Sequence, residues 1–303
     1  MYSFSTCWNS ARHTDGREML NEIRDLGFEY AELSHGIRMS LMPGILGAVE
    51  DGSIKISTLH NFCPLPVGVD KPASNLYEFS SDRDRDRQLA LKHTLNTFDF
   101  AVKVRAPLVV LHFGSMDLKD YTGKLKELLE RGDKGSIKFQ KVVVEANAAR
   151  EAKKRKYYDR SRDMLRELVG EAKFRGLKLG IEIREAVEEL PVESDFESLL
   201  KEFTDPVFYW HDTGHAQIKD DLGFINHAEF LAARADRLAG FHIHDVKFPA
   251  RDHFPPGGGS IDFAALQPFV KPEHIKVFEF SPSLTVEQLK SGVAHVKKIW
   301  GED

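Results

Sequence analysis

The sequence predicts a single (β/α)8 barrel that spans residues 1–303. Short apolar runs alternate with longer amphipathic stretches along the chain, which is typical of βα units that feed a parallel sheet. Several of the runs are apolar almost throughout, as strands covered on both faces should be. Eight such runs occur, each followed by a helical pattern, and this arrangement favours a closed barrel over an open sheet.

The predicted elements follow one another in order along the chain. Strands are expected at residues 2–7, 28–33, 55–60, 107–113, 178–183, 206–211, 239–245 and 275–280. Helices are expected at residues 15–26, 39–50, 83–104, 138–175, 194–203, 222–236, 262–268 and 285–299. Neither a GxGxxG nor a GxxxxGK[ST] loop follows any of these strands, which excludes the usual nucleotide-binding folds.

The segment from about residue 114 to residue 160 is longer than an ordinary connection between strand and helix. It contains the charged run DLKDYTGKLKELLERGDKGSIKFQ and the basic stretch REAKKRK. Because it follows the fourth strand, we expect an extended helical insertion on the catalytic face. A lid or a contact within a homo-oligomer would account for this insertion, and so would a solvated helical excursion.

The composition is that of an ordinary water-soluble protein, with 42% hydrophobic and 29% charged residues. The net charge of −5 neither recruits nor excludes a polyanion, and the 2 cysteines do not form a disulfide framework. The N-terminus lacks the pattern of a secretory signal, and the chain lacks an apolar run of membrane-spanning length. A cytoplasmic protein without membrane attachment is therefore expected.

Residues that can bind metal ions stand at the ends of six consecutive predicted strands. In barrels of this kind the active site is built from those positions. In chain order they are His60, His112, Glu182, Asp212 with His215, His242 and Glu279. A single buried histidine or carboxylate would ordinarily be a hydrogen-bonded core residue. Several carboxylates converging on one small volume would repel one another and lose hydration, and a divalent cation would offset both costs.

Four of these residues form a plausible ligand set for one metal ion. Glu182, Asp212, His242 and Glu279 offer three carboxylates and one imidazole. Such a set suits Mn²⁺ or Mg²⁺ and also tolerates Zn²⁺ or Co²⁺. His211 and His244 alternate with candidate ligands along their strands, so their side chains are expected to point away from the mouth of the barrel.

Several motifs together resemble the xylose isomerase-like barrel superfamily, which contains isomerases and epimerases of sugars and sugar phosphates and is related to endonuclease IV. The motifs are EIRDLGFEYAELS at residues 22–34, GIEIRE, HDTGHA, FHIHDVK, PPGGGSIDF and VFEFSP. Each is weak alone, but the combination is specific and extends over nearly the whole chain. The resemblance implies that Glu182, Asp212, His242 and Glu279 are the four ligands of the metal site shared by that family.

The resemblance also implies catalytic roles. In the isomerase and epimerase branch, glutamates that match Glu182 and Glu279 flank the substrate carbon and exchange its proton. His215 matches a position that contacts substrate oxygens in that branch and binds metal in the nucleases.

Other histidines match the nuclease branch of the superfamily. His60, His112 and His253 match positions that hold further zinc ions there, so together with His215 they are candidates for a second metal ion or for the substrate. The nuclease pattern also has an aspartate two residues before the last of these histidines, where this chain has Arg251. An arginine would repel a cation but can donate to a substrate hydroxyl, carboxylate or phosphate.

Arg251 is therefore expected to bind substrate, and Trp8 and Lys247 near the mouth are further candidates for substrate contact. The mouth loops are not rich in lysine and arginine outside residues 150–156, so a nucleic-acid partner is not expected.

The expected function is a divalent-metal-dependent isomerase or epimerase of a sugar, a sugar phosphate or a keto-polyol. Proton transfer at a carbon next to a carbonyl needs a base at the carbon and a Lewis acid at the oxygen. Glu182 and Glu279 would exchange the proton around a metal-stabilised cis-enediolate. The alternatives are a zinc-dependent apurinic-site phosphodiesterase, a lyase that uses the same chemistry, and a non-catalytic sugar-binding barrel.

Overall fold

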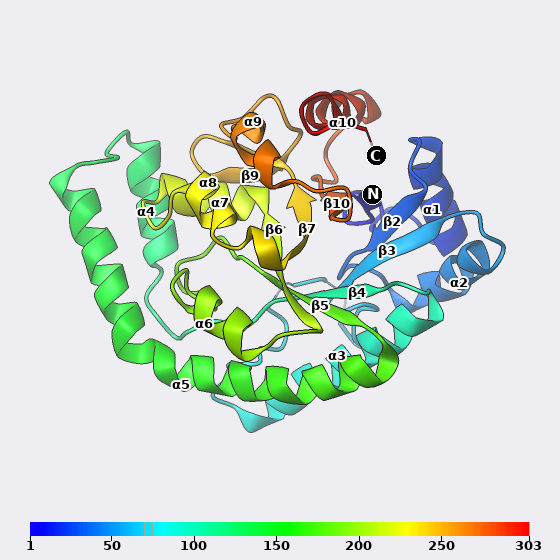
Figure 1. Ribbon diagram of the computed structural model, residues 1–303, viewed down its shortest axis with the longest axis horizontal. Helices are drawn as coiled ribbons and strands as arrows, with labels where there is room; N and C mark the ends of the chain where they lie inside the picture. Colours follow the sequence, from blue (N-terminus) through cyan, green and yellow to red (C-terminus); the bar gives the residue numbers. More distant parts are fainter. Residues whose placement is uncertain (70, 74, 303) are drawn as a thin grey trace.

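The computed structural model describes residues 1–69, 71–73 and 75–302 and forms a closed parallel barrel (Figure 1). The strand order around the barrel is β1-β10-β7-β6-β5-β4-β3-β2, which confirms the predicted fold class. The barrel strands are β1 (Tyr2–Ser5), β2 (Tyr30–Leu33), β3 (Lys55–His60), β4 (Leu108–Leu111), β5 (Lys178–Glu182), β6 (Val207–Asp212), β7 (Leu238–Ile243) and β10 (Ile275–Phe278).

The inside of the barrel is filled by apolar side chains below the mouth. Five buried residues form a cluster separate from the main core: Leu108, Val110, Trp210, Ile275 and Val277. Side chains alternate along a strand, so residues two positions beyond these also point inward, at the C-terminal mouth. Those residues are His112, Asp212 and Glu279, which lie above the apolar cluster.

Helices surround the barrel, with α10 above it and α5 along its left and lower edge in the view of Figure 1. They are α1 (Gly16–Asp25), α2 (Met42–Glu50), α3 (Asp84–Lys103), α4 (Tyr121–Glu130), α5 (Ile137–Arg175), α6 (Asp195–Glu202), α7 (Thr213–Asp221), α8 (His227–Ala232), α9 (Phe263–Leu266) and α10 (Val286–Trp300). In the described part of the chain, no helix has both the length and the apolar content needed to cross a bilayer.

The chain between β4 and β5 forms α4 and the 39-residue helix α5, in the region where the sequence predicted a helical insertion. Ser136 caps the start of α5 through a hydrogen bond to Phe139 N, and Gly176, with φ of 68°, ends the helix. The Glu188 carboxylate accepts hydrogen bonds from the backbone of Tyr121 and Thr122, so it joins the start of α4 to the loop after β5.

Two parts of the predicted element order are wrong. One helix was expected at residues 222–236, but α7 starts directly after β6 because the Asp212 side chain accepts a hydrogen bond from His215 N. Gly223, with φ of 83°, then separates α7 from α8. The sequence prediction also missed an antiparallel hairpin of β8 (Asp245–Lys247) and β9 (Arg251–Phe254), which lies beside the mouth after β7.

Candidate functional site

Four buried side chains meet at the C-terminal mouth of the barrel. Glu182 ends β5, Asp212 ends β6, His242 lies in β7, and Glu279 directly follows β10. The strand register brings them together, since Glu182 is opposite Trp210 and Asp212 is opposite His242. One potential ligand atom from each of the four lies within 4.8 Å of those of the others. Three carboxylates and one imidazole at this spacing fit a divalent cation.

The His242 ring presents its two nitrogens to different partners. Nδ1 lies 2.5 Å from Glu182 Oε1, 3.3 Å from Glu279 Oε2 and 3.9 Å from Asp212 Oδ2. On the other side of the ring, Nε2 lies 2.9 Å from Glu32 Oε2. A carboxylate on the outer nitrogen of a histidine fixes the ring and leaves the inner nitrogen for a metal ion.

Glu32 is a site residue that the sequence analysis missed. It lies in β2, is fully buried, and accepts a hydrogen bond of 2.8 Å from Thr58 Oγ1. Its other oxygen, Oε1, has no hydrogen-bond partner in the structure. Its position near the end of the second predicted strand was the signal in the sequence, although the predicted ligands came only from the third strand onward.

Opposite charges are concentrated around these carboxylates. Burial would raise the pKa of Glu182, but Arg184, His112 and His242 hold it well below its usual range. Burial likewise opposes a charge on His242, but the neighbouring carboxylates outweigh burial and raise its pKa well above the usual value. The site thus contains carboxylates that stay ionised and require positive charge beside them, a role that suits a cation.

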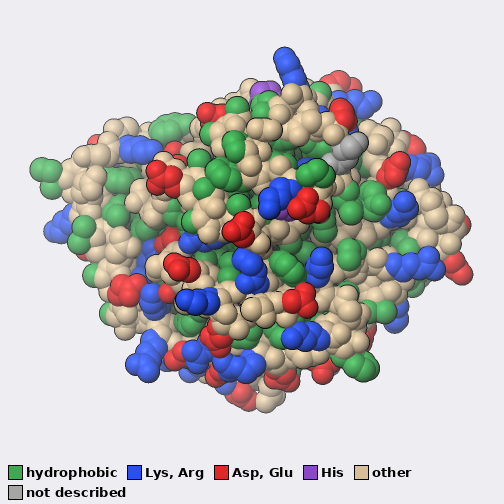
Figure 2. Space-filling model, in the orientation of Figure 1, with side chains coloured by type: hydrophobic (Ala, Val, Ile, Leu, Met, Phe, Trp, Pro, Cys, Tyr) green, Lys and Arg blue, Asp and Glu red, His purple; other side chains and the backbone are tan. Residues whose placement is uncertain are grey.

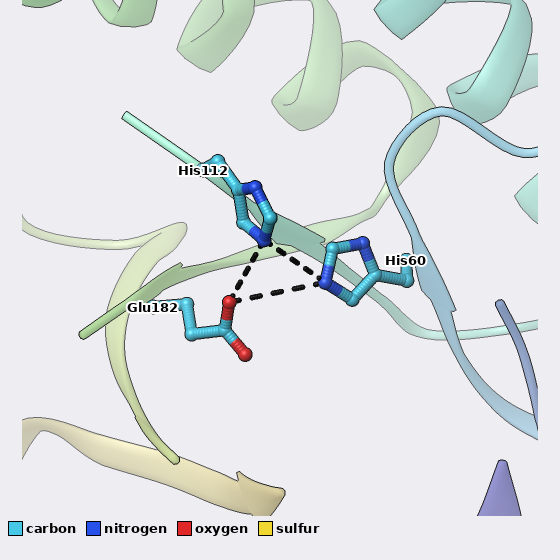
Figure 3. Close-up of side chains that lie close together, drawn as sticks. All are labelled: His60, His112 and Glu182. Carbon is cyan, nitrogen blue, oxygen red and sulfur yellow. Dashed lines mark hydrogen bonds and ion pairs between the residues drawn. The ribbon is translucent and has the colours of Figure 1, made fainter. Parts of the chain in front are cut away.

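A second group shares Glu182 and consists of His60, His112 and Glu182, from β3, the end of β4 and β5 (Figure 3). His112 Nε2 lies 2.9 Å from Glu182 Oε2 and 3.1 Å from His60 Nε2. Burial and the Arg184 charge lower the pKa of His112 to about 4, so its ring is neutral at pH 7, the form that binds metals. The structure therefore brings these two predicted histidines to the main cluster.

The prediction that His244 points away from the mouth is wrong. Its Nε2 lies 3.0 Å from Asp212 Oδ1, and it forms a third candidate group with Asp212 and His215. β7 ends at Ile243 and the chain then turns into β8, so strand alternation does not extend to His244. His211 does lie elsewhere, because its ring is hydrogen-bonded to Tyr209 and to His227 of α8.

Near position 251 the side chain that faces the site is Asp252. Its Oδ1 lies 3.2 Å from Nδ1 of His253, and its Oδ2 lies 3.9 Å from Nε2 of His215. Burial opposes a charge on His253, but Asp252 outweighs burial and raises the pKa of His253 to about 9. His253 has φ of 58°, which interrupts strand alternation, and Arg251 remains exposed. The sequence predicted the decisive charge at Arg251, whereas in the structure the charge beside His215 and His253 belongs to Asp252.

Arg184 is a second site residue that the sequence analysis missed. Its Nη1 donates to Glu182 Oε2 at 2.8 Å, and its Nε donates to Glu189 Oε1 at 3.2 Å. The motif GIEIRE contained the information needed to predict this residue. Arg184 stands two residues after Glu182, and side-chain alternation along a strand places both on the same face of the strand.

The other predicted substrate residues lie outside this cluster. The Trp8 ring is buried, and its Nε1 donates to Leu284 O at 3.0 Å. The Lys247 ammonium lies 4.7 Å from the centre of the Phe254 ring and borders a separate cavity of about 260 Å³ with Pro255 and His295. Neither side chain lines the main cavity at the mouth.

The main cavity has a volume of about 670 Å³, within the range of small-molecule sites. Asp252, His253 and Glu279 line it on the side of the metal-ligand cluster. The rest of its lining comes from the loops that follow β1, β2, β3 and β10. A small molecule in this cavity would therefore reach the Glu279 carboxylate directly.

Comparison with known proteins defines the family. No curated protein sequence gives a significant match. A putative xylose isomerase from Rhodospirillum rubrum ATCC 11170 has a TM-score of 0.73, with 18% identity and 98% of both chains covered. A D-tagatose 3-epimerase-like protein has a TM-score of 0.66, with 17% identity and 98% of both chains covered. D-psicose 3-epimerase from Clostridium cellulolyticum H10, solved with D-tagatose, has a TM-score of 0.64, with 12% identity and 99% of both chains covered.

At these identities the solved structures establish the fold alone. The sequence profile of the xylose isomerase-like TIM barrel family, in contrast, matches residues 20–274, which is most of the chain. The protein therefore belongs to the xylose isomerase-like TIM barrel family.

Proposed function

We propose that this protein is a divalent-metal-dependent epimerase or isomerase of a ketose or a closely related keto-polyol. The observation that carries the proposal is the placement of Glu182 and Glu279. Their carboxylate oxygens lie 2.5 and 3.3 Å from the same atom, His242 Nδ1, and Glu279 also lines the main cavity. Two carboxylates so close to one point, together with a third from Asp212, supply both a cation site and groups that can carry a proton.

A divalent cation held by Glu182, Asp212, His242 and Glu279 would act as a Lewis acid that stabilises negative charge on substrate oxygens. Glu279 lines the cavity and would take a proton from the substrate carbon beside the carbonyl. Glu182 is fully buried and, as an end residue of a different strand, would return the proton from another direction. Exchange between two sides of the carbon gives epimerisation, whereas return to the neighbouring carbon gives isomerisation.

The remaining residues orient these two glutamates. Arg184 and His112 both contact Glu182 Oε2, which leaves Oε1 toward His242. His215 is held by Asp212 and by the carbonyl of Ile183, at a hydrogen-bond distance of 3.0 Å from the latter. His215 and His253 can donate to substrate hydroxyl groups from the side of the site formed by α7 and β9.

The names of similar structures agree with this chemistry. The similar solved structures described above include a D-tagatose 3-epimerase-like protein and a D-psicose 3-epimerase. Both names describe epimerisation at a carbon of a ketose, which is one of the two reactions proposed here. Their low sequence identity leaves the assignment to this chain resting on the site residues.

Deuterium wash-in tests the proposal. The protein loaded with Mn²⁺ or Co²⁺ is incubated in D₂O with a panel of ketoses, and proton NMR follows exchange at the carbon beside the carbonyl. We expect exchange into at least one sugar and its loss after chelation with EDTA. If no sugar exchanges although the metal is bound, the protein is not an epimerase or isomerase of this class.

One alternative is supported by a specific observation, namely the three additional groups of potential metal ligands. His60 with His112, and His244 with His253, extend the set beyond a single cation, as a metal-dependent phosphodiesterase would require. The basic stretch at residues 150–156, however, is largely paired: Lys154 contacts Glu151 and Asp195, and Lys156 contacts Asp82. On the face drawn in Figure 2, cationic and anionic side chains are interspersed.

Duplex DNA binding draws on rows of unpaired cations along the phosphate backbone, so these pairings favour a small substrate. Nicking of abasic duplex DNA by the zinc-loaded protein, without exchange into any ketose, would select the nuclease instead.

A further inference from the structure

The main cavity is lined by side chains of both charges. The carboxylates among its lining residues are Asp252 and Glu279, which lie beside His215 and His242 of the metal-ligand groups. The cationic side chains Arg38 and Lys71 line the cavity as well, from the loops that follow β2 and β3. A ligand that fills this space would meet carboxylates and a cation site from the metal-ligand groups, and positive charge from the loops after β2 and β3.

Arg38 is held in place without being neutralised. Its Nη2 donates to the backbone carbonyl of Ser10 at 3.2 Å and also to that of His13. Within the described residues, no carboxylate lies at ion-pair distance from its guanidinium. Its Nε is buried without a hydrogen-bond partner. Two carbonyl contacts fix the orientation of the guanidinium but leave its charge and part of its donor set unused.

Hydroxyl groups and a second cation line the same cavity as Arg38. A methyl group built on Gly36 would lie 3.2 Å from Ser10 Oγ, 3.6 Å from Ser34 Oγ and 3.7 Å from Pro72 Cγ. Pro72 therefore packs near Gly36, and its neighbour Lys71 lines the same cavity. Among the described residues, Lys71 also has no ion pair.

We propose that Arg38, with Lys71 and the hydroxyl groups of Ser10 and Ser34, forms an anion subsite that selects a substrate carrying a phosphate or a carboxylate. The inference rests on the proposed function and specifies its substrate class. The carbonyl and hydroxyl end of the substrate lies at Glu279, and the anionic end lies at Arg38. An arginine fork with flanking hydroxyl groups suits the several oxygens of either anion.

Unpaired charge in a cavity is costly for a protein that binds only neutral sugars. A cation partly removed from water destabilises the fold unless a ligand or a carboxylate compensates it. A neutral ketose offers only hydroxyl groups, and a hydrogen bond from lysine or arginine to a hydroxyl group is little stronger than one to water. An anionic group on the substrate gains a charge-assisted contact at this wall, and the energy of that contact contributes to binding.

The experiment measures the affinity of the Mn²⁺-loaded protein for three matched ligands by calorimetry. D-fructose is neutral, D-fructose 6-phosphate carries a phosphate, and D-fructuronate carries a carboxylate on an otherwise similar chain. We expect at least one of the two anionic ligands to bind about tenfold more tightly than D-fructose. The tighter of the two identifies whether the subsite takes a phosphate or a carboxylate.

The variants Arg38→Gln and Lys71→Met test the assignment to these residues. Arg38→Gln should remove most of the preference for the anionic ligand, while affinity for D-fructose stays within about twofold. Lys71→Met should remove part of it. Because Arg38 also holds two carbonyls, Arg38→Lys serves as a second variant that keeps the charge, and it should retain an intermediate preference. Lys138→Met, which removes an exposed charge on α5, is the matched control and should bind all three ligands as the wild type does.

The outcomes separate this inference from the proposed function. Equal binding of D-fructose and both anions, or an anion preference that survives Arg38→Gln in the folded protein, overturns the subsite. Deuterium exchange into neutral ketoses would leave the epimerase or isomerase assignment in place in either case. Absence of exchange into every ketose, neutral or anionic, would instead count against the proposed function itself.

Discussion

Glu32 Oε2 lies 2.9 Å from His242 Nε2, on the side of the imidazole ring opposite to Glu182. Both side chains are fully buried, so bulk water does not compete for this contact. An ionised carboxylate can only accept a hydrogen bond, so Nε2 carries a proton toward Glu32. A metal ion among the carboxylates would displace the proton from Nδ1 and bind the lone pair of that nitrogen. Glu32 thus selects the nitrogen of His242 that is available to a metal ion.

Replacement of Glu32 by glutamine is expected to weaken metal binding by about tenfold to hundredfold. An amide can donate to Nε2 as well as accept from it, so it no longer enforces one tautomer. Competition titration with a chromophoric chelator gives the affinity for Co²⁺, and the Co²⁺ absorption spectrum reports the ligand geometry. Glu197→Gln, which changes an exposed glutamate on α6, should bind Co²⁺ as the wild type does. If the Co²⁺ affinity and the absorption spectrum of Glu32→Gln were unchanged, Glu32 would not determine which nitrogen of His242 binds the metal ion.

Replacement of Glu193 by glutamine is expected to destabilise the fold by about 3–5 kcal/mol at neutral pH. Glu193 contacts Arg150 and Lys219, whose side chains are only 3% and 2% exposed, and the variant leaves both cations buried without a counter-charge. Urea denaturation measures the loss in the free energy of unfolding.

The same contact should give a pH dependence. Burial would raise the pKa of Glu193, but Lys219 and Arg150 outweigh burial and lower it to about 2. A lowered carboxyl pKa stabilises the fold fully above the unfolded value, near 4.3, and this contribution disappears as the pH falls toward 2. The difference between wild type and Glu193→Gln should therefore shrink between pH 5 and pH 2. A difference that stays constant over that range would argue against the ion pairs.

Arg251→Ala and Asp252→Asn distinguish the sequence-based assignment of the mouth from the structure-based one. Arg251 is exposed and lies outside the main cavity, so its loss should change kcat/KM by less than about twofold. Asp252→Asn should lower the pKa of His253 from about 9, because the carboxylate that raises it is gone. NMR titration of the imidazole and steady-state kinetics measure the two effects. A loss of about 2 kcal/mol in transition-state terms for Arg251→Ala would restore that residue to the substrate site.

Much of the fold was predictable because the strands are short, apolar and widely spaced along the sequence. β4, with the sequence LVVL, is buried at every position. A short run that is apolar throughout is typical of a strand covered on both faces. The start of α7 was missed because Asp212 serves both as a candidate metal ligand and as the helix cap. Asp212 was predicted only as a metal ligand, so the helix that begins directly after it was not predicted.

The site was predictable where strand periodicity holds and was missed where it breaks. Glu182, Asp212, His242 and Glu279 lie at strand ends, and the register of the barrel brings them together. His244 and Asp252 lie in or beside the hairpin of β8 and β9, whose turn and left-handed residues depend on tertiary packing. Periodicity in the sequence carries no information on such a turn.

The contacts between Arg38 and two backbone carbonyl groups were also not predictable from the sequence. Ser10 and His13 belong to the loop after β1, and Arg38 belongs to the loop after β2, so the contact joins two loops that the sequence leaves unrelated. Only the barrel closure places them side by side.

The central claim is that Glu182 and Glu279 exchange a proton with the substrate carbon beside a bound cation. The most direct measurement is deuterium wash-in from D₂O by wild type, Glu182→Gln and Glu279→Gln, with bound metal and the melting temperature determined on the same samples. His93→Gln, a change outside the metal-ligand groups, serves as the control and should exchange at the wild-type rate. We predict that each glutamine variant remains folded and loses at least about a hundredfold of the exchange rate, the usual contribution of a positioned acid or base. Exchange at near-normal rates in both folded glutamine variants would contradict the account.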